Sequence, residues 1–295
     1  MHDYILLVDF DETITVTDTL SFVAAAGYET NSISQPWAEF GNAYMADYNK
    51  FTEQYKPESR TSIASELAAL EAVESVELAS VANVERSGLF KGVTHAALTK
   101  QAQNVQVRPG VSQVLQLCAR SKGVNTVSII SVNWSSLFIC EVLKQTCGVS
   151  ASAANKTSSD DAVDVTVYSN EIEMDELGRG TGSLQDSSAY NLRTGAHKAS
   201  ILRQIQNEQH GKTIYLGDST GDLAPLLEAD LGVIVGQKKS LRETCARIGV
   251  KIEPFKSLPR GEILSNINAG SDEKVLFALD HWYELLSYGP LAEIY

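Results

Sequence analysis

The sequence predicts an α/β fold, a Rossmann-like parallel sheet with helices on both faces, together with an inserted all-helical subdomain. Short apolar runs of strand length alternate with segments whose apolar residues recur at helical spacing. Residues 19–105 break this alternation, because they contain helical patterns and no convincing strand. At 295 residues the chain is also longer than one ordinary domain, which leaves room for an insertion.

The strands of the predicted sheet are near-continuous apolar runs, rich in valine or isoleucine and bounded by Gly, Asp or Ser. Runs of this kind are typical of strands that are buried on both faces of a parallel sheet. We expect such strands at residues 4–10, 126–131, 213–216 and 232–235.

Helical patterns lie between these runs. Apolar residues recur at helical spacing over 111–120 and over 200–206. Ser240 stands three residues before Glu243, which is a capping-box pattern, and Gly249 is placed to end the same helix. Strands that alternate with helices in this way predict a parallel sheet covered on both faces.

The inserted region has helical patterns of its own. Residues 63–84 are rich in Ala, Glu and Leu and predict one or two helices. Five aromatic residues recur at spacings of three and four, which places them on one helix face: Trp37, Phe40, Tyr44, Tyr48 and Phe51. We therefore expect a core of residues 1–18 and 106–295, interrupted by a helical cap of residues 19–105.

Two further segments are less regular. Residues 151–161 predict a loop, and residues 165–184 predict a β-hairpin flap. In the tail, residues 254–295, Trp282 and its apolar neighbours predict a final helix. This helix could pack on the core or contact a second copy of the chain, so both a monomer and a homodimer remain open.

Composition and charge exclude several classes of protein. The hydrophobic fraction of 43% and the charged fraction of 21% are ordinary for globular proteins. A formal charge of −13 argues against nucleic acid or an anionic membrane surface as a partner. Because we find no membrane-spanning run and no basic leader, we expect a cytoplasmic protein, with the nucleus as an alternative. The four cysteines form no CxxC pair, which argues against a zinc site or a disulfide framework.

Pairs of carboxylates follow two of the predicted strands. Asp9 and Asp11 come at the end of the first strand, and Asp218 and Asp222 follow the third. Open α/β sheets bind ligands at the carboxyl ends of their strands, where these side chains would meet. The hard oxygens of Asp9, Asp218 and Asp222 suit Mg²⁺, which also binds phosphate. Each pair alone is equally consistent with a solvated acidic turn or a helix cap, so the prediction depends on their combination.

Hydroxyl, amide and ammonium groups complete the set of candidate active-site residues. Ser131 and Asn133 follow the second strand just before a predicted helix, an arrangement that favours anions, and Lys198 precedes a later helix. Alone, such residues more often cap a helix or face solvent. Together, Asp9 could attack phosphorus to form an aspartyl phosphate, while Asp11 protonates the leaving alkoxide and then activates water. Ser131 and Lys198 could hold the phosphoryl oxygens.

With these residues in this order, the sequence resembles the haloacid dehalogenase superfamily of phosphohydrolases. The four matching motifs are Asp9-Phe10-Asp11-Glu12-Thr13, Ser131, Lys198, and Gly217-Asp218 through Asp222. The resemblance implies a phosphoric monoester hydrolase in which Asp9 is the nucleophile and a Mg²⁺ ligand. It implies that Asp11 is the acid/base, with a backbone carbonyl that also binds the ion, and that Thr13 supports the turn. A departing halide needs no proton donor, so the second acid argues against dehalogenation.

A narrower resemblance concerns the substrate. Residues 131–134, 170–172 and 217–230 are similar to the phosphatase domain of plant bifunctional thiamine-biosynthesis proteins and to related fungal proteins. This resemblance implies thiamine monophosphate as the first candidate substrate, with phosphoserine as another. We expect Thr13 and Asn133 beside the substrate. Trp37 and Tyr44 are candidates to stack on a cationic heterocycle, although such an aromatic stripe more often forms the core of a cap.

The leading expectation is therefore a magnesium-dependent phosphomonoester hydrolase for a small phosphorylated metabolite. A phosphotransferase or phosphomutase would use the same residues with an acceptor other than water. The alternative from another class is a non-catalytic regulatory protein that binds a phosphorylated metabolite. All the motif residues are present, which favours the enzyme.

Overall fold

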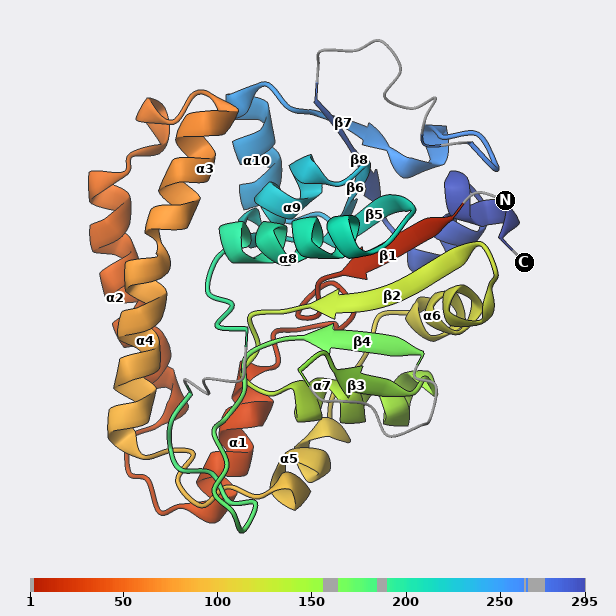
Figure 1. The fold of residues 1–295 in the computed structure, drawn as a ribbon. Helices are drawn as coiled ribbons and strands as arrows, with labels where there is room; N and C mark the ends of the chain where they lie inside the picture. The colour runs from red at the N-terminus through yellow and green to blue at the C-terminus, as the bar shows by residue number, and fades with distance from the viewer. Residues whose placement is uncertain (1–2, 156–163, 185–189, 263, 265–273, 295) are drawn as a thin grey trace.

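The computed structural model describes residues 3–155, 164–184, 190–262, 264 and 274–294 (Figure 1). Within these residues, eight strands form one parallel sheet in the order β3-β4-β2-β1-β5-β6-β8-β7. The strands are β1 (Tyr4–Val8), β2 (Val124–Ile130), β3 (Ala151–Ala153), β4 (Val165–Tyr168), β5 (Lys212–Gly217), β6 (Leu231–Val235), β7 (Lys251–Pro254) and β8 (Val275–Leu279). The parallel sheet confirms the predicted fold class.

Helices cover both faces of the sheet (Figure 1). One layer contains α6 (Val111–Arg120) and α7 (Ser136–Val142), and the other contains α8 (Gly195–Glu208), α9 (Leu223–Glu228) and α10 (Lys239–Ile248). Because side chains alternate along a strand, β1 contributes to both layers. Leu6 and Val8 belong to the apolar cluster of the first layer, and Ile5 and Leu7 to that of the second. All four are fully buried, which explains why this strand has no polar face.

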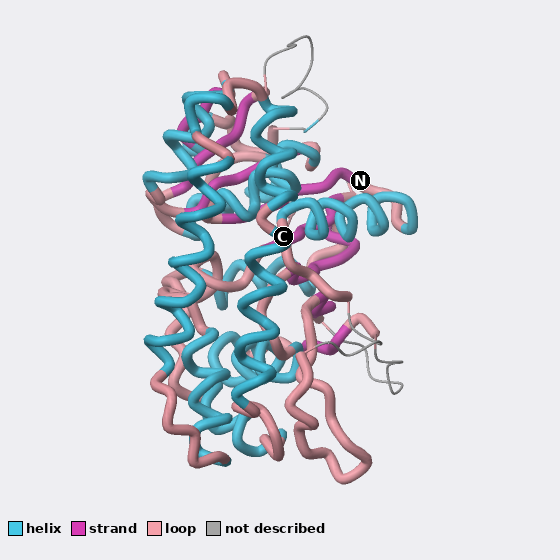
Figure 2. Tube along the Cα trace, turned by 90° about the vertical axis from the view of Figure 1, so that its left-hand side faces the viewer, coloured by secondary structure: helices cyan, strands magenta, loops and turns pink. Residues whose placement is uncertain are grey.

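Between β1 and β2 the described chain is mainly helical. The helices are α1 (Leu20–Thr30), α2 (Trp37–Gln54), α3 (Ile63–Ala72), α4 (Glu74–Ser87) and α5 (His95–Ala102), with a short 3-10 turn at Pro57–Ser59. Helices α2, α3 and α4 stand beyond the carboxyl ends of the central strands, and Figure 2 shows them along the length of the molecule. Helix α5 packs against α1 and against α7. The division into a core and a cap of residues 19–105 stays a prediction.

The predictions for residues 151–184 are partly wrong. Ala151–Ala153 forms the edge strand β3, and the rest of the predicted loop lies largely outside the described residues. Val165–Tyr168 is the inner strand β4 and takes no part in a hairpin. The hairpin begins later, where the N–H of Glu173 donates to the carbonyl of Ser183.

This hairpin docks on the segment that joins α4 to α5. The N–H of Gly180 donates to the carbonyl of Val93, and the N–H of Gly92 donates to the carbonyl of Gly180. A Cβ at Gly180 would lie 2.1 Å from the carbonyl oxygen of Phe90, so this close approach requires glycine. The hairpin and the inserted helices are therefore joined by backbone hydrogen bonds.

The helix predicted in the tail is present as a short 3-10 helix at Trp282–Leu286. Strand β8 inserts between β6 and β7, and two 3-10 turns follow it, at Trp282–Leu286 and Pro290–Glu293. Trp282 is buried in the apolar cluster of the first layer, whereas its neighbour Tyr283 is half exposed. The tail thus completes the sheet and packs on the core.

Two helix starts differ from the prediction. Helix α8 begins at Gly195, before the predicted start at residue 200, so Lys198 lies in its first turn. Helix α10 begins at Lys239, and the predicted capping box at Ser240 is wrong, since Ser240 lies inside the helix and the N-cap residue is Lys238, whose side chain makes no capping hydrogen bond. Gly249 ends α10 in the left-handed conformation, as predicted. Among the described residues, no helix combines the length and apolar character needed to cross a membrane.

Candidate active site

The turn that follows β1 places Asp9 and Asp11 at the carboxyl edge of the sheet. The N–H of Asp9 donates to the carbonyl of Leu216 in β5, which keeps this residue beside the neighbouring strand. Glu12 adopts a left-handed conformation, with φ 58°, which is uncommon for a residue other than glycine. The guanidinium of Arg108 donates to the Glu12 carbonyl at 2.9 Å. A side chain from outside the turn therefore stabilises its unusual backbone.

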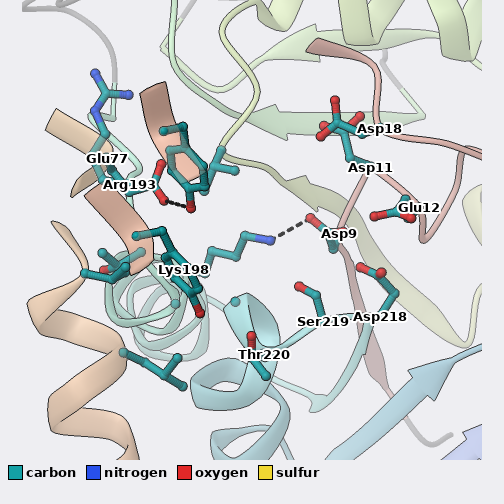
Figure 3. A pocket seen from close by; sticks show the side chains of 18 of the residues that line it. Asp9, Asp11, Glu12, Asp18, Glu77, Arg193, Lys198, Asp218, Ser219 and Thr220 are labelled. Carbon is teal, nitrogen blue, oxygen red and sulfur yellow. Dashed lines mark hydrogen bonds and ion pairs between the residues drawn. The ribbon is translucent and has the colours of Figure 1, made fainter. Parts of the chain in front are cut away.

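Lys198 projects from α8 toward the carboxylates (Figure 3). Its Nζ lies 2.6 Å from Asp9 Oδ1 and 2.8 Å from Asp222 Oδ1, and all three side chains are buried. Asp222 Oδ1 also accepts a hydrogen bond from the Tyr215 hydroxyl, and its Oδ2 accepts one from the N–H of Ser219. Asp222 thus orients Lys198 toward Asp9.

The cluster of carboxylates has the chemistry of a divalent cation site. Side-chain oxygens of Asp9, Asp218 and Asp222 lie within 4.8 Å of one another. A donor set made only of oxygen suits Mg²⁺. Asp222 accepts five hydrogen bonds, whereas Asp9 and Asp218 accept two each, so Asp9 and Asp218 are the more available donors. The structure brings together the three side chains predicted as ligands, and direct ligation by each stays a prediction.

Burial and mutual repulsion decide the charges in this cluster. Burial, followed by the charge of Asp222, raises the pKa of Asp9 well above its usual range, and the Lys198 ammonium opposes this shift. Burial and Asp222 likewise raise the pKa of Asp218. At Asp222 the effect of burial is outweighed by Lys198, so the pKa is lowered. Lys198 is shared between Asp9 and Asp222, and Lys238 between Asp218 and Glu12, so a divalent cation would add positive charge to a cluster in which carboxylates outnumber ammonium groups.

Asp11 is oriented by the start of α1 and by the turn after β2. Its Oδ1 accepts hydrogen bonds from the N–H of Thr19 at 2.7 Å and from the Thr19 hydroxyl at 2.5 Å. Its Oδ2 accepts one from the amide of Asn133 at 3.1 Å. Burial and the nearby charge of Asp18 raise the pKa of Asp11 to about 6, against these hydrogen bonds. A carboxyl group with this pKa can both donate and accept a proton near neutral pH.

Three further predicted residues lie behind the carboxylates. Thr13 is fully buried and donates to Asp9 Oδ2 at 2.9 Å. Ser131 is buried at the end of β2, where its hydroxyl accepts from the N–H of Asn133 at 3.1 Å. The Asn133 amide contacts Asp11 and Thr19. These contacts order the motif residues, and direct contact of Thr13, Ser131 and Asn133 with a substrate stays a prediction.

Two chambers open on the site. The first, of about 340 Å³, is lined by Asp9, Asp11 and Lys198. The second, of about 350 Å³, lies between α2, α4 and the turn after β2. Both include Glu77 and Arg193 in their walls, so the chambers adjoin. Figure 3 shows Glu77 and Arg193 on one side and Asp9 and Asp11 on the other, with Lys198 between them and directed at Asp9.

The second chamber is aromatic. Trp37 packs edge-on against Trp134, with ring centroids 6.1 Å apart. Tyr44 lines both chambers, and its hydroxyl donates to Glu77 at 2.8 Å. Burial raises the pKa of Glu77. Trp37 and Tyr44 therefore line the space into which the alcohol part of a substrate at Asp9 could extend, and stacking on a substrate stays a prediction.

Three residues of this region were not singled out from the sequence. Thr19 and Glu77 lie far along the chain from the groups they contact, and nothing in their local sequence marks them. Lys238 follows β6 and contacts Asp218 at 2.9 Å. Asp218 was identified because it follows a predicted strand, and Lys238 also follows one. The sequence therefore contained a signal that could have identified Lys238.

Relatives from a plant and a yeast match most of this chain. The bifunctional TH2 protein of Arabidopsis thaliana, a mitochondrial protein, is 25% identical over 280 residues, which cover 86% of this chain. The chain spans only 43% of that relative. A CTO1 family protein of Schizosaccharomyces pombe is 25% identical over 248 residues, which cover 82% of this chain and 85% of the relative.

Similar solved structures include a phosphoserine phosphatase that holds an analogue of the phospho-aspartyl intermediate. It is 15% identical, covers 83% of this chain and 91% of its own, and superposes with a TM-score of 0.49. The model of the family described as haloacid dehalogenase-like hydrolase matches residues 6–227, which include all four motifs. This match confirms the resemblance seen in the sequence: the chain belongs to the haloacid dehalogenase-like hydrolases.

Proposed function

We propose that this hydrolase is a magnesium-dependent phosphomonoesterase that acts through an aspartyl phosphate on a small phosphorylated metabolite. The observation that carries the proposal is the buried pair of Asp9 and Lys198, 2.6 Å apart, in the wall of a chamber that also contains Asp11. A nucleophile, a cation for phosphoryl oxygens and an acid/base thus face one space.

The reaction proceeds in two steps. A carboxylate oxygen of Asp9 attacks phosphorus, the bond from phosphorus to the ester oxygen breaks, and Asp11 gives its proton to the leaving alkoxide. Asp11, now a carboxylate, takes a proton from water as that water attacks the phosphorus of the aspartyl phosphate. The bond to Asp9 breaks, phosphate leaves, and both side chains return to their starting state. Lys198 stays beside the equatorial oxygens in both steps.

Asp9 and Asp218 are the side chains best placed to hold Mg²⁺, with Asp222 beside them. When bound, the ion supplies positive charge to the phosphoryl group and to Asp9. Lys198 carries one positive charge and pairs with two buried carboxylates, Asp9 and Asp222. This imbalance supports the need for an additional cation.

Thiamine monophosphate is the first candidate substrate. The second chamber offers aromatic rings, including Trp37 and Trp134, and a carboxylate at Glu77, which together suit a flat cationic heterocycle. The sequence resemblance described above and the match to the TH2 protein support the same choice. Phosphoserine is the second candidate, because Glu77 and Arg193 could pair with its amino and carboxylate groups.

The test is phosphate release by the purified chain with Mg²⁺ from p-nitrophenyl phosphate, thiamine monophosphate, phosphoserine, pyridoxal phosphate and nucleotides. We expect turnover that EDTA and Asp9→Asn abolish. Asp47→Asn, at a half-exposed position of α2 outside both chambers, is the matched control and should leave turnover unchanged. Absence of turnover on the whole panel would contradict the proposal.

The same assay separates the alternatives. Transfer of the phosphoryl group to an added alcohol or sugar in preference to water would indicate a phosphotransferase. Tight binding of one phosphate ester without hydrolysis would indicate a regulatory protein. A higher kcat/KM for phosphoserine than for thiamine monophosphate would exchange the first candidate for the second.

A further inference from the structure

Lys238 is a second lysine of the site that the four motifs leave without a role. It lies between β6 and α10, and its Nζ is 2.9 Å from Asp218 Oδ2 and 2.5 Å from Glu12 Oε2. The loop that carries it is held in place, because the Arg242 side chain donates to the carbonyl of Gly236 at 3.2 Å. Lys238 thus reaches the site from the side of β6.

The two lysines divide the carboxylates between them. Lys198 pairs with Asp9 and Asp222 and is buried, whereas the Lys238 side chain is 37% exposed and pairs with Asp218 and Glu12. Other acidic residues also line the first chamber. We use the name acidic crevice for Asp9, Asp11, Glu12, Asp18 and Asp218, all of which line the first chamber.

Lys238 contacts Asp218, the same carboxylate that a bound cation would contact. The ammonium of Lys238 donates to Asp218 Oδ2, one of the two oxygens that this side chain can offer to a cation. The other oxygen, Oδ1, lies 3.5 Å from the Thr13 hydroxyl, at the limit of a hydrogen bond. An ion that takes up Asp218 Oδ2 must displace the ammonium, and the two positive charges then repel each other at short range.

We propose that Lys238 is a positioning residue that competes with the divalent cation for Asp218. It neutralises Asp218 and Glu12 in the metal-free protein and releases Asp218 when the ion binds. The inference rests on the proposed magnesium site. Lys238 thereby stabilises the acidic crevice when no metal is bound, and it limits the affinity for the ion so that binding stays reversible.

Removal of the ammonium therefore has two effects of opposite sign. Without metal, Asp218 and Glu12 lose their partner and repel the other acids of the crevice, so the protein becomes less stable. With metal, the competitor is gone, so the ion binds more tightly. A lysine with only a structural role would lower stability in both states and would leave the affinity for the ion unchanged or weaker.

The experiment is a calorimetric titration of Mg²⁺ into the full chain, freed of metal with EDTA and dialysed, together with melting temperatures with and without Mg²⁺. The variant is Lys238→Met. The matched control is Lys239→Met, because Lys239 is the adjacent residue, carries the same charge, and is 86% exposed with Glu243 as its partner at 3.4 Å. Lys238→Arg keeps the charge.

For Lys238→Met we expect a Mg²⁺ affinity roughly fivefold to tenfold above wild type, as befits a partly exposed ion pair. We also expect a lower melting temperature without metal and a larger rise on addition of Mg²⁺. Lys239→Met and Lys238→Arg should stay within about twofold of wild type.

Equal or weaker binding by Lys238→Met, while the wild type binds, would overturn the role of Lys238 and leave the proposed metal site intact. An equal gain of affinity in Lys239→Met would also overturn it, because the effect would then follow net charge alone. No binding of Mg²⁺ by the wild type would overturn the metal site and the inference together.

Discussion

At the scale of single residues, the two carboxylates of the first motif have been given different environments. Asp9 is paired with Lys198 at 2.6 Å, whereas Asp11 is bonded to Thr19 and Asn133 and has no cation among these partners. The pKa of Asp11 is raised to about 6, which leaves roughly a tenth of the molecules protonated at this group at pH 7. This difference suits one group to attack and the other to exchange a proton.

We predict that Asp11→Asn separates the two chemical steps. p-Nitrophenolate leaves without a proton, so the variant should still form the aspartyl phosphate from p-nitrophenyl phosphate. It should then stall, because no base activates water. A rapid-quench assay should show a burst of about one p-nitrophenolate per protein, followed by turnover at least about 100-fold slower than wild type. Steady turnover at the wild-type rate would contradict the assigned role.

The motif residues could be predicted from the sequence because they occupy a general position, the carboxyl end of a parallel strand. Asp9, Ser131 and Asp218 all follow buried runs that are recognisable by composition. Thr19 and Glu77 could not be predicted, since their roles depend on how α1 and α4 fold back over the sheet.

At the scale of elements, the tail of the chain supports the catalytic turn. The 3-10 turn after β8 carries Trp282, whose indole N–H donates to the carbonyl of Thr13 at 3.1 Å. Its side chain is only 1% exposed. Residues 269 positions apart in the chain thus meet at the first motif.

We predict that Trp282→Phe lowers stability by about 1–2 kcal/mol, since it leaves the Thr13 carbonyl without this donor and reduces packing. Because the same turn carries Asp9 and Asp11, kcat should fall with it. The matched control is Tyr283→Phe, at the adjacent half-exposed position. Urea unfolding and steady-state kinetics measure both effects. Equal behaviour of the two variants would show that the indole hydrogen bond contributes nothing.

The central strands could be predicted because they are long apolar runs, whereas the outer elements could not. β3 has three residues and β4 has four. In such short segments the spacing of apolar residues cannot distinguish a strand of the main sheet from a strand of a hairpin. β8 is an apolar run, but it pairs with β6 across a long excursion of the chain. The 3-10 turn at Trp282–Leu286 has an apolar pattern that also fits an α-helix.

At the scale of the whole molecule, the inserted helices are tied to the core at a point far from the chain connections. Glu66 in α3 is 1% exposed and pairs with Arg60 at 3.0 Å and with Arg247 of α10 at 2.7 Å. Arg60 also lines the first chamber. This ion-pair cluster therefore connects the position of α3 to the shape of the site.

We predict that Glu66→Gln lowers stability by at least about 2 kcal/mol, because two arginines lose their buried counter-charge. Displacement of Arg60 should also raise KM more than it lowers kcat. Glu71→Gln, at an exposed position of the same helix, is the matched control. Chemical unfolding and kinetics on one substrate provide the comparison. A change in stability with KM unaltered would show that the cluster does not influence the site.

The charge of the whole molecule has a different meaning once the site is located. The sequence has a formal charge of −13, and five of its acids line the acidic crevice. An anionic phosphate ester is nevertheless compatible with this wall, since Lys198, Lys238 and a bound cation would offset the local negative charge.

The central claim is that Asp9 carries the phosphoryl group between the two steps. Asp11→Asn mixed with p-nitrophenyl phosphate and Mg²⁺, quenched in acid and digested, tests it by mass spectrometry. We expect one phosphoryl group on the peptide that contains Asp9, and none when the same sample also carries Asp9→Asn. Phosphate release without any phosphorylated peptide, or a phosphoryl group on another residue, would contradict the account.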